Sequence, residues 1–479
     1  MADAEEEWSD DYPWDELDEL SENEGGTSQE SMAPARYEVM ELAEEHPAYL
    51  VLAGGPSGTV VSTPPPGSVT RSGIASAIPS RDQAIDGQRL LFLYHAGQPN
   101  FTQGREVLSR LHAMNGAALG IGVVTSIPRH TPKKIADVFD CHVAAIRIAD
   151  PEGFWADRGS LLLESEDPAS YPNEDAGLRA ARKASNMRDR APYLGMVGQD
   201  QFVSEVVAAQ RQAGANVILT SGRALNPSTA ARSIADLVEE GDHLHSLLRG
   251  DERMALNLTL PHDFMTNKAL GEMLLAELLE RDQFDTWYVR GQWRYNEGGP
   301  LLRDPDVLSF YKELSNLAEE EERKLILPQS GLTGWYFLAH GAKGFGTGTA
   351  AAQQAFFQHR VFGRQQNITD VQRIFERALI HAIEYRTHRS LVGQKGYLPC
   401  DCRWCEAVDG TGVYNRSILQ WHTLYSQGQL CAAAKGTISA GGSRAAVRRI
   451  VRRSQQFRES QVLLGKDDPK HLSSWLQML

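Results

Sequence analysis

Three of the chain's five cysteines lie within six residues, in the segment GYLPCDCRWCE over residues 396–406. The spacing C-x-C-x-x-C of Cys400, Cys402 and Cys405 lets a tight turn direct three thiolates at one tetrahedral metal ion. The amino terminus is acidic rather than basic and apolar, so we expect no secretion signal and a reducing compartment, where metal binding is favoured over disulfides. The segment therefore predicts a structural zinc site in a cytoplasmic protein.

A closed zinc site needs a fourth ligand, and the chain offers His422, Cys431 and Cys141. His422 lies in a predicted helix over residues 414–434 that can fold back onto the cysteine loop. Cys431 is nine residues further on, on roughly the opposite face of that helix, so we do not expect both to bind. His422 is the expected ligand and Cys431 the alternative. A site closed by four protein ligands is structural, so any chemistry lies elsewhere.

Carboxylates that follow strand-like runs form the second group of residues suited to chemistry. Asp150 ends the run AAIRIAD, and Asp263 follows the run MALNLTLPH, beside His262. A carboxylate can attack a sugar or move a proton, and a histidine can act as an acid or a base. For Asp150, a helix N-cap or turn before Pro151 is an equally good interpretation.

The segments that must position these residues alternate between β-rich runs and amphipathic helices. Residues 202–213 and 270–281, for example, place apolar side chains at i, i+3, i+4 and i+7. About eight such repeats predict an α/β protein with a (β/α)8 TIM-type barrel, in which all strands end at one mouth. The predicted strands cover residues 90–95, 144–150, 193–197, 217–220, 254–260, 286–290, 324–327 and 343–346, with residues 120–125 as a further candidate.

The chain divides into a tail over residues 1–35, a barrel over residues 36–360, and a helical, zinc-binding and basic region over residues 361–479. The tail holds thirteen Asp or Glu and no Lys or Arg, so it carries nearly all of the net charge of −14. Such a segment predicts disorder, although its three aromatic residues also fit an acidic interaction segment. The apolar content of 42% and the lack of a long apolar run are typical of a globular protein without a membrane span.

The carboxy-terminal region is predicted to be helical over residues 350–395, a loop over 396–412, and helical again over 414–434 and 443–458. The last helix concentrates arginines in the run SRAAVRRIVRRSQQFR, a density that suits contacts with phosphates. A solvated basic face is the alternative interpretation. The predicted nucleic-acid contacts are Arg444, Arg448, Arg449, Arg452 and Arg453, followed by Arg458.

The order of these features resembles the tRNA-guanine transglycosylase family, including its queuine, archaeosine and DNA-modifying members. In that family, C-x-C-x-x-C follows a barrel and precedes a helix with a histidine in an L-x-x-H-N-L context. The counterpart here is SILQWHTLY, with Thr423 at the usual Asn and a shorter gap between Cys405 and His422. The run AIRIADPEGF resembles the family's L-T-D-S-G-G-[FY] strand end, and residues 324–349 resemble its last two strands. The resemblance covers about residues 90–460.

The resemblance implies an exchange of guanine in tRNA or DNA for a 7-deazaguanine base, through a covalent bond between an aspartate and the ribose. It implies that Asp150 contacts the base and assists proton transfer, and that the backbone of Gly291 lies against the base. This chain departs from the family at Gly346, where the nucleophile is usual. It also departs at the second base-recognising aspartate, where it reads Ser221, Gly222 and Arg223.

We therefore expect Gly291, Arg223 and Gly346 at the substrate subsite, and Asp263 as the best remaining nucleophile beside Asp150. The run GFGTGT around Gly346 can also cradle a phosphate. Two functions remain open. The first is a transglycosylase-like enzyme. The second is a catalytically silent, nucleic-acid-binding or scaffolding subunit, as a homodimer or paired with a related active subunit.

Overall fold

The computed structural model describes residues 77–97, 101–156, 161, 174–196, 198, 201–293, 301–357, 372–400, 402–412, 414–436 and 442–479. The acidic tail over residues 1–35 lies outside the described residues. The described residues belong to one compact unit, which therefore includes both the barrel and the carboxy-terminal region.

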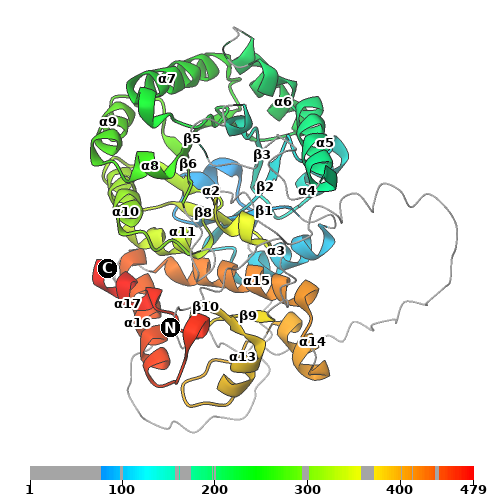
Figure 1. Ribbon diagram of the computed structural model, residues 1–479, viewed down its shortest axis with the longest axis vertical. Helices are drawn as coiled ribbons and strands as arrows, with labels where there is room; N and C mark the ends of the chain where they lie inside the picture. The colour runs from blue at the N-terminus through cyan, green and yellow to red at the C-terminus, as the bar shows by residue number, and fades with distance from the viewer. Residues whose placement is uncertain are drawn as a thin grey trace, which may run out of the picture. The chain divides into compact units, whose positions relative to one another are not determined.

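Eight parallel strands form one sheet in the order β3-β2-β1-β8-β7-β6-β5-β4 and curve into a nearly closed barrel (Figure 1). β1 pairs with both β2 and β8, so the first and last strands lie side by side as they do in a barrel. The expected (β/α)8 class is confirmed. The strands are β1 (Leu90–His95), β2 (Leu119–Ser126), β3 (Ile146–Asp150), β4 (Val217–Leu219), β5 (Arg253–Leu260), β6 (Thr286–Gly291), β7 (Lys324–Leu327) and β8 (Gly344–Thr347).

The side chain of Asn216 spans the seam between β3 and β4. It accepts from Arg147 N at 2.8 Å through Oδ1 and donates to Ala145 O at 2.9 Å through Nδ2. The backbone N–H of Asn216 donates to Arg147 O at 3.0 Å. Asn216 thus forms hydrogen bonds with backbone groups of β3 and its neighbours that would have no partner where β3 and β4 do not pair.

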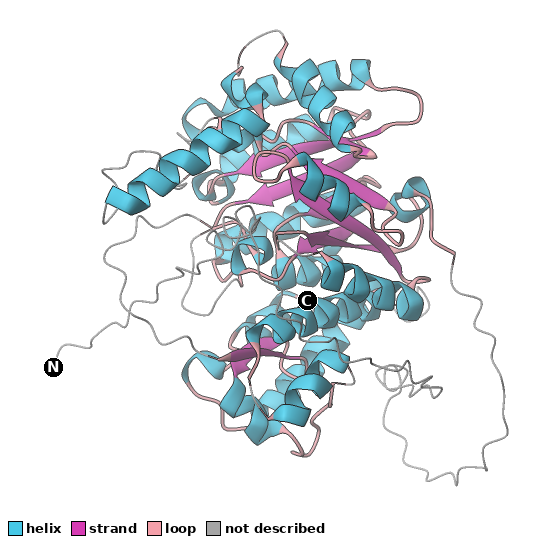
Figure 2. Ribbon diagram, turned by 90° about the vertical axis from the view of Figure 1, so that its right-hand side faces the viewer, coloured by secondary structure: helices cyan, strands magenta, loops and turns pink. Residues whose placement is uncertain are grey.

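Helices lie between the strands and cover the outside of the barrel (Figures 1 and 2). Their apolar faces pack on the outward-facing strand residues and form the main core. The barrel helices are α2 (Arg81–Ile85), α3 (Thr102–Asn115), α4 (Pro132–Phe139), α5 (Glu174–Arg190), α6 (Phe202–Ala213), α7 (Ala230–Leu247), α8 (His262–Met265), α9 (Lys268–Leu279), α10 (Pro305–Glu320), α11 (Gly331–Phe337) and α12 (Ala351–Gln354).

Two expectations about the strands need correction. The run over residues 193–197 is not a strand, because Pro192–Gly195 forms a 3₁₀ turn with the proline in its first positions. Proline fixes a helical φ and lacks the N–H that a central strand must donate. The candidate at residues 120–125 takes its place as β2, which is buried along its whole length.

The carboxy-terminal region is less helical than expected over residues 350–395. Here β9 (Arg373–Glu376) pairs antiparallel with β10 (His381–Glu384), and Ile374 and Ile383 lie opposite each other and share a small apolar core. The expected loop over 396–412 contains a helix that begins beside Cys402. The helices are α13 (Tyr385–Leu391), α14 (Arg403–Thr411), α15 (Arg416–Ala434), α16 (Gly442–Glu459) and α17 (His471–Met478).

This region packs directly on the barrel through α15, which lies against α3 and α11. Trp335 Nε1 in α11 donates to Leu430 O in α15 at 2.9 Å, and the Tyr336 hydroxyl donates to Trp475 O in α17 at 3.3 Å. Among the described residues, no helix is both long enough and apolar enough to cross a membrane.

Candidate metal centre and barrel mouth

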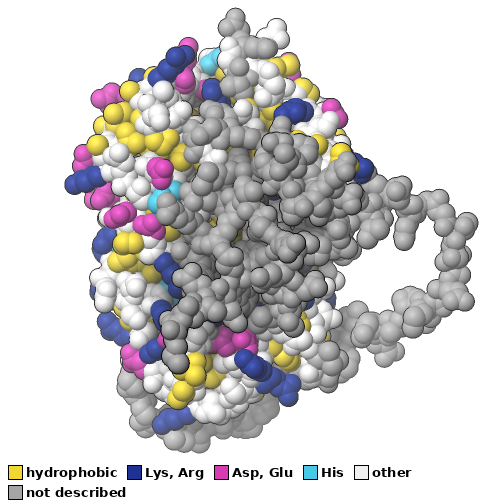
Figure 3. Space-filling view, viewed as in Figure 1, with side chains coloured by type: hydrophobic (Ala, Val, Ile, Leu, Met, Phe, Trp, Pro, Cys, Tyr) yellow, Lys and Arg dark blue, Asp and Glu magenta, His cyan; other side chains and the backbone are white. Residues whose placement is uncertain are grey.

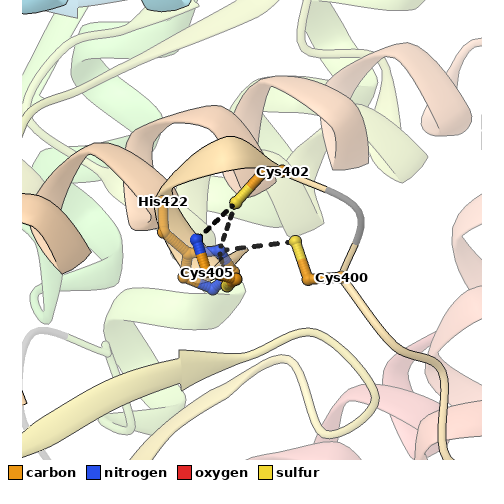
Figure 4. A group of neighbouring side chains, drawn as sticks. All are labelled: Cys400, Cys402, Cys405 and His422. Atoms are coloured by element: carbon orange, nitrogen blue, oxygen red, sulfur yellow. Dashed lines mark hydrogen bonds between the residues drawn. The ribbon is translucent and has the colours of Figure 1, made fainter. Parts of the chain in front are cut away.

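Cys400, Cys402, Cys405 and His422 converge on one point in the carboxy-terminal region (Figure 4). Their ligand atoms all lie within 4.8 Å of one another, and His422 Nδ1 lies 3.5, 3.3 and 3.0 Å from the three sulfurs in chain order. A tetrahedral zinc with ordinary bond lengths separates its ligand atoms by about 3.5–3.8 Å. The four residues can therefore hold one metal ion, and their geometry fits zinc.

Backbone groups fix the orientation of these ligands. His422 Nε2 lies 2.8 Å from Phe375 O in β9, and a carbonyl only accepts, so Nε2 carries the proton and Nδ1 presents its lone pair. Cys402 is the N-cap of α14, and its sulfur accepts from Cys405 N at 3.4 Å. The hairpin and the two helices thus position the site together.

The three thiols are too close to ionise together without a cation. Hydrogen bonds from Cys402 and Cys405 hold the pKa of Cys400 below its ordinary value. Hydrogen bonds with Cys400 and Cys402, and then burial, raise the pKa of Cys405. Three thiolates at this spacing are stable together only when a cation offsets their repulsion, which is the role of a bound metal.

The other two cysteines lie elsewhere in the core. Cys431 faces the barrel, where its sulfur lies 3.8 Å from Leu91 O, and burial raises the pKa of its thiol. Cys141 is buried in the main core, and burial raises the pKa of its thiol to about 11. Cys431 follows His422 by nine residues on α15 and therefore lies on the opposite face of the helix. His422, not Cys431, is the residue that lies beside the three thiols.

Asp150 and Arg290 are buried at the carboxyl ends of β3 and β6. Ile146 and Ile148 in β3, and Tyr288 in β6, belong to the core inside the barrel, so alternation directs Asp150 and Arg290 inward as well. The two side chains form an ion pair, and they are 2% and 0% exposed. Burial raises the pKa of Asp150 above its ordinary value, although Arg290 opposes this increase.

Glu152 adds a second carboxylate that the sequence analysis missed. Its backbone N–H donates to Asp150 Oδ1 at 3.0 Å, and its Oε2 accepts from Arg129 Nε at 2.9 Å and Trp155 Nε1 at 2.8 Å. Burial raises the pKa of Glu152, but Arg129 and Arg290 outweigh this and hold it below its ordinary value. Its φ is +46°, in the left-handed region that favours glycine.

Asp263, the other predicted catalytic carboxylate, lies in the first turn of α8 after β5. Its side chain is 79% exposed and lies 3.2 Å from His262 Nδ1. His262 Nε2 in turn lies 2.9 Å from Asp304 Oδ2, the N-cap of α10. Among the described residues, no hydrogen bond joins Asp263 to Asp150. The structure thus places Glu152, not Asp263, beside Asp150.

Gly346 lies inside the barrel against His95, which is buried at the end of β1. A Cβ at Gly346 would lie 2.3 Å from His95 Nε2 and 3.1 Å from Pro328 Cα. His95 Nε2 accepts from Gln329 N at 3.3 Å, and burial lowers the pKa of His95 to about 3. A neutral imidazole therefore occupies the space that a side chain at position 346 would need.

The remaining predicted substrate residues have separate surroundings. A Cβ at Gly291 would lie 2.4 Å from the Tyr311 hydroxyl and 2.5 Å from Met265 Sδ, so close packing with the outer helices explains this glycine. Arg223 follows β4 and its charge acts on the partly buried Glu240, which accepts hydrogen bonds from Ser221. The described contacts do not join either residue to Asp150.

The predicted arginine helix is α16. Arg444, Arg448, Arg449 and Arg452 are exposed and Arg453 is partly exposed, whereas Arg458 pairs with Asp468 at 2.8 Å. In the described part of the chain, no ion pair joins the first five to an acidic side chain. On the face drawn in Figure 3, acidic and basic side chains are interspersed along the left-hand edge.

No protein-family model matches the sequence. A search of curated proteins likewise finds no significant match.

Proposed function

We propose that this protein exchanges guanine for a 7-deazaguanine base in tRNA or DNA, at the carboxyl ends of its barrel strands. One observation carries the proposal. Asp150 and Glu152 are buried at the mouth, and their surroundings move their pKa values in opposite directions. Pairs of carboxylates separated in this way are typical of sites where one group is a proton donor and the other stays ionised.

The two carboxylates suit the two demands of the exchange. The ionised carboxylate, Glu152, bonds to the anomeric carbon of the ribose as the bond to guanine N9 breaks. Guanine leaves with the electron pair of the broken bond and takes up a proton, and Asp150 is the carboxyl to which we assign this proton transfer. The incoming base then gives its proton back to Asp150 and displaces Glu152 from the sugar. Glu152 suits the role of nucleophile better than Asp263 does, because Asp263 is exposed and lies on another element.

The remaining parts of the proposal concern the metal and the polymer. The metal is zinc, because a closed Cys3His site with these separations suits it and leaves no open position for catalysis. Reduced thiolates fit a cytoplasmic protein. The arginines of α16 that form no ion pair with the described residues, Arg444, Arg448, Arg449, Arg452 and Arg453, provide phosphate contacts for tRNA or DNA.

The direct test is an exchange assay with the full chain loaded with zinc. Labelled guanine is incubated with bulk tRNA and, separately, with DNA, and label is counted in the polymer. We expect incorporation into one of the two, and its displacement by an unlabelled 7-deazaguanine base. Absence of label from both polymers would reject the enzyme.

A catalytically silent subunit is the second candidate, and the surroundings of Gly346 favour it. The usual nucleophile position has no carboxylate, and the imidazole of His95 fills the space beside it. Such a subunit would bind the polymer through α16, alone as a homodimer or beside a related active subunit. Gel-shift binding to tRNA or DNA without any base exchange, in a protein that keeps its zinc, would identify this function.

A further inference from the structure

Arg290 has more hydrogen-bond donors than the protein satisfies. Its Nη2 is paired with Asp150 Oδ2, but Nε and Nη1 are buried and have no hydrogen-bond partner among the described residues. A guanidinium presents five N–H donors and no acceptor, and the three on Nε and Nη1 have no acceptor among the described residues. Buried polar groups in native proteins almost always have a partner, and a bound ligand can provide the one that the described residues do not.

The surroundings of the guanidinium are flat and aromatic. Its Cζ lies 5.0 Å from the ring centroid of Phe154, 5.9 Å from that of Tyr288 and 5.7 Å from that of Phe356. Phe154 and Phe356 also contact each other, with centroids 5.0 Å apart. Because Arg290 is 0% exposed, an acceptor reaches it only when neighbouring side chains move aside. Rings of this kind offer a planar base a face on which to stack.

The charges around Arg290 are already balanced. Arg290 pairs with Asp150, and Arg129 pairs with Glu152 at 2.9 Å. A further buried anion, such as a phosphate or a carboxylate, would leave this cluster with an uncompensated negative charge. The free donors therefore suit a neutral acceptor, either a carbonyl oxygen or an unprotonated ring nitrogen.

We propose that Arg290 determines specificity by donating from Nη1 to the 6-oxo group of a purine base held in the barrel mouth. This inference rests on the proposed base exchange and names the chemical group that its site reads. A 6-aminopurine presents N–H donors at the same position, so donor would face donor and the base would be rejected. Arg290 thus separates guanine-like bases from adenine-like ones.

The test compares hypoxanthine with adenine, which differ at position 6, by calorimetric titration of the full, zinc-loaded chain. We expect hypoxanthine to bind at least about tenfold more tightly than adenine. In Arg290→Lys, which keeps the charge beside Asp150 but loses the guanidinium donors, hypoxanthine affinity falls about tenfold to a hundredfold. Adenine affinity stays unchanged, so the preference disappears.

Arg253→Lys is the matched control. Arg253 pairs with Asp86 and Asp285 at the amino end of β5, and its replacement leaves the preference intact. The wild-type comparison needs no variant, so the proposal stays testable even if Arg290→Lys does not fold. The proposal is overturned if the wild type binds the two purines equally or binds neither of them. It is also overturned if folded Arg290→Lys keeps the preference for hypoxanthine. If the protein prefers hypoxanthine but exchanges no base into tRNA or DNA, the proposed enzymatic function is wrong, whereas the role of Arg290 in recognising the 6-oxo group stands.

Discussion

At the scale of single residues, the barrel mouth is defined by side chains that depart from local preference. Glu152 holds a left-handed φ that usually costs a non-glycine residue about 1–2 kcal/mol. The same backbone places its carboxylate between Arg129 and Trp155 and its N–H on Asp150. Strain of this kind persists when the surrounding contacts fix it, and it is common where a side chain acts on a ligand.

Glu152→Gln should separate the two possible second carboxylates. The amide keeps the shape of Glu152 but removes the charge that a bond to the ribose requires, so we expect exchange to fall by about a thousandfold or more. Asp263→Asn, on the exposed turn after β5, should change exchange less than about tenfold. The measurement is the initial rate of labelled-guanine incorporation. A larger loss in Asp263→Asn would return the role to Asp263.

Gly346→Ala should destabilise the barrel, because the new Cβ would lie 2.3 Å from His95 Nε2. Overpacking of this kind costs about 1–3 kcal/mol of unfolding free energy, measured by urea denaturation. Gly250→Ala is the control, since a Cβ there meets nothing within 4 Å. Adding His95→Ala should recover part of the loss. Full stability of Gly346→Ala would show that His95 moves aside freely.

At the scale of elements, the metal site depends on three pieces that approach from different directions. β9 supplies the Phe375 carbonyl, α14 begins at Cys402, and α15 carries His422. Asn415 starts α15 by accepting from Ile418 N at 3.1 Å, which sets the helical position of His422. The same helix presents Cys431 to the barrel, so one element serves both the metal site and the packing.

His422→Ala should lower bound zinc from about one ion per chain to a small fraction, because three thiolates leave the fourth position to water. Cys431→Ser should keep its zinc, although burying a hydroxyl without a partner lowers its stability. Metal analysis by mass spectrometry after dialysis checks both variants. Zinc retained in His422→Ala and lost in Cys431→Ser would reverse the ligand assignment.

The hairpin should make stability depend on pH through His381. Burial, with Arg373 nearby, lowers the pKa of His381 from 6.5 to about 4, and its Nε2 donates to Lys466 O at 2.8 Å. Between these two values the unfolded chain binds the proton and the folded chain does not, so stability falls as the pH falls. From pH 7 to pH 5 the loss is at most about 2 kcal/mol.

His381→Gln keeps a hydrogen-bond donor but cannot titrate, so it should lose less stability over this interval than the wild type. Urea unfolding of both proteins at pH 7 and pH 5 measures the difference. Protonation of the metal ligands affects both proteins and cancels in the comparison. An identical pH dependence would mean that His381 does not carry this effect.

At the scale of the whole molecule, the proposed active site and the first residues of α16 lie at opposite ends of the barrel. Asp150 ends β3 at the mouth. A cavity of about 580 Å³ at the other end is lined by Leu90, where β1 begins, by Lys343, just before β8, and by Arg444. A polymer that places a base in the mouth must therefore pass along the flank of the barrel to reach α16.

Reversing charge on α16 should weaken polymer binding whatever the sequence of the nucleic acid. Arg448→Glu with Arg452→Glu should reduce affinity at low salt and lessen the slope of log K against log salt by about two. Arg232→Glu with Lys268→Glu alters two exposed cations on α7 and α9 and should change both quantities much less. Fluorescence anisotropy at several salt concentrations measures them. An unchanged slope in the α16 variant would exclude this helix from the interface.

The sequence by itself determined most of the elements and the three cysteines of the candidate metal site, because both depend on patterns that extend over a few residues. Apolar periodicity marked seven of the eight barrel strands, with the eighth held as a further candidate, and the spacing of Cys400, Cys402 and Cys405 marked the metal site. Local patterns failed where a proline interrupted an apolar run at residues 192–195, and where β9 and β10 formed a hairpin inside an expected helix.

Only the tertiary structure decided which distant residues meet in the mouth. Barrel closure brings Arg290 to Asp150, 140 residues away in the chain, and places the His95 ring where a side chain at Gly346 would lie. The left-handed turn that buries Glu152 follows from contacts with Arg129 and Trp155 rather than from its own preference. Such pairings depend on strand register and on buried charges that are stable only when their partners are present. Neither the register nor the charge pairing produces a periodic pattern in the sequence.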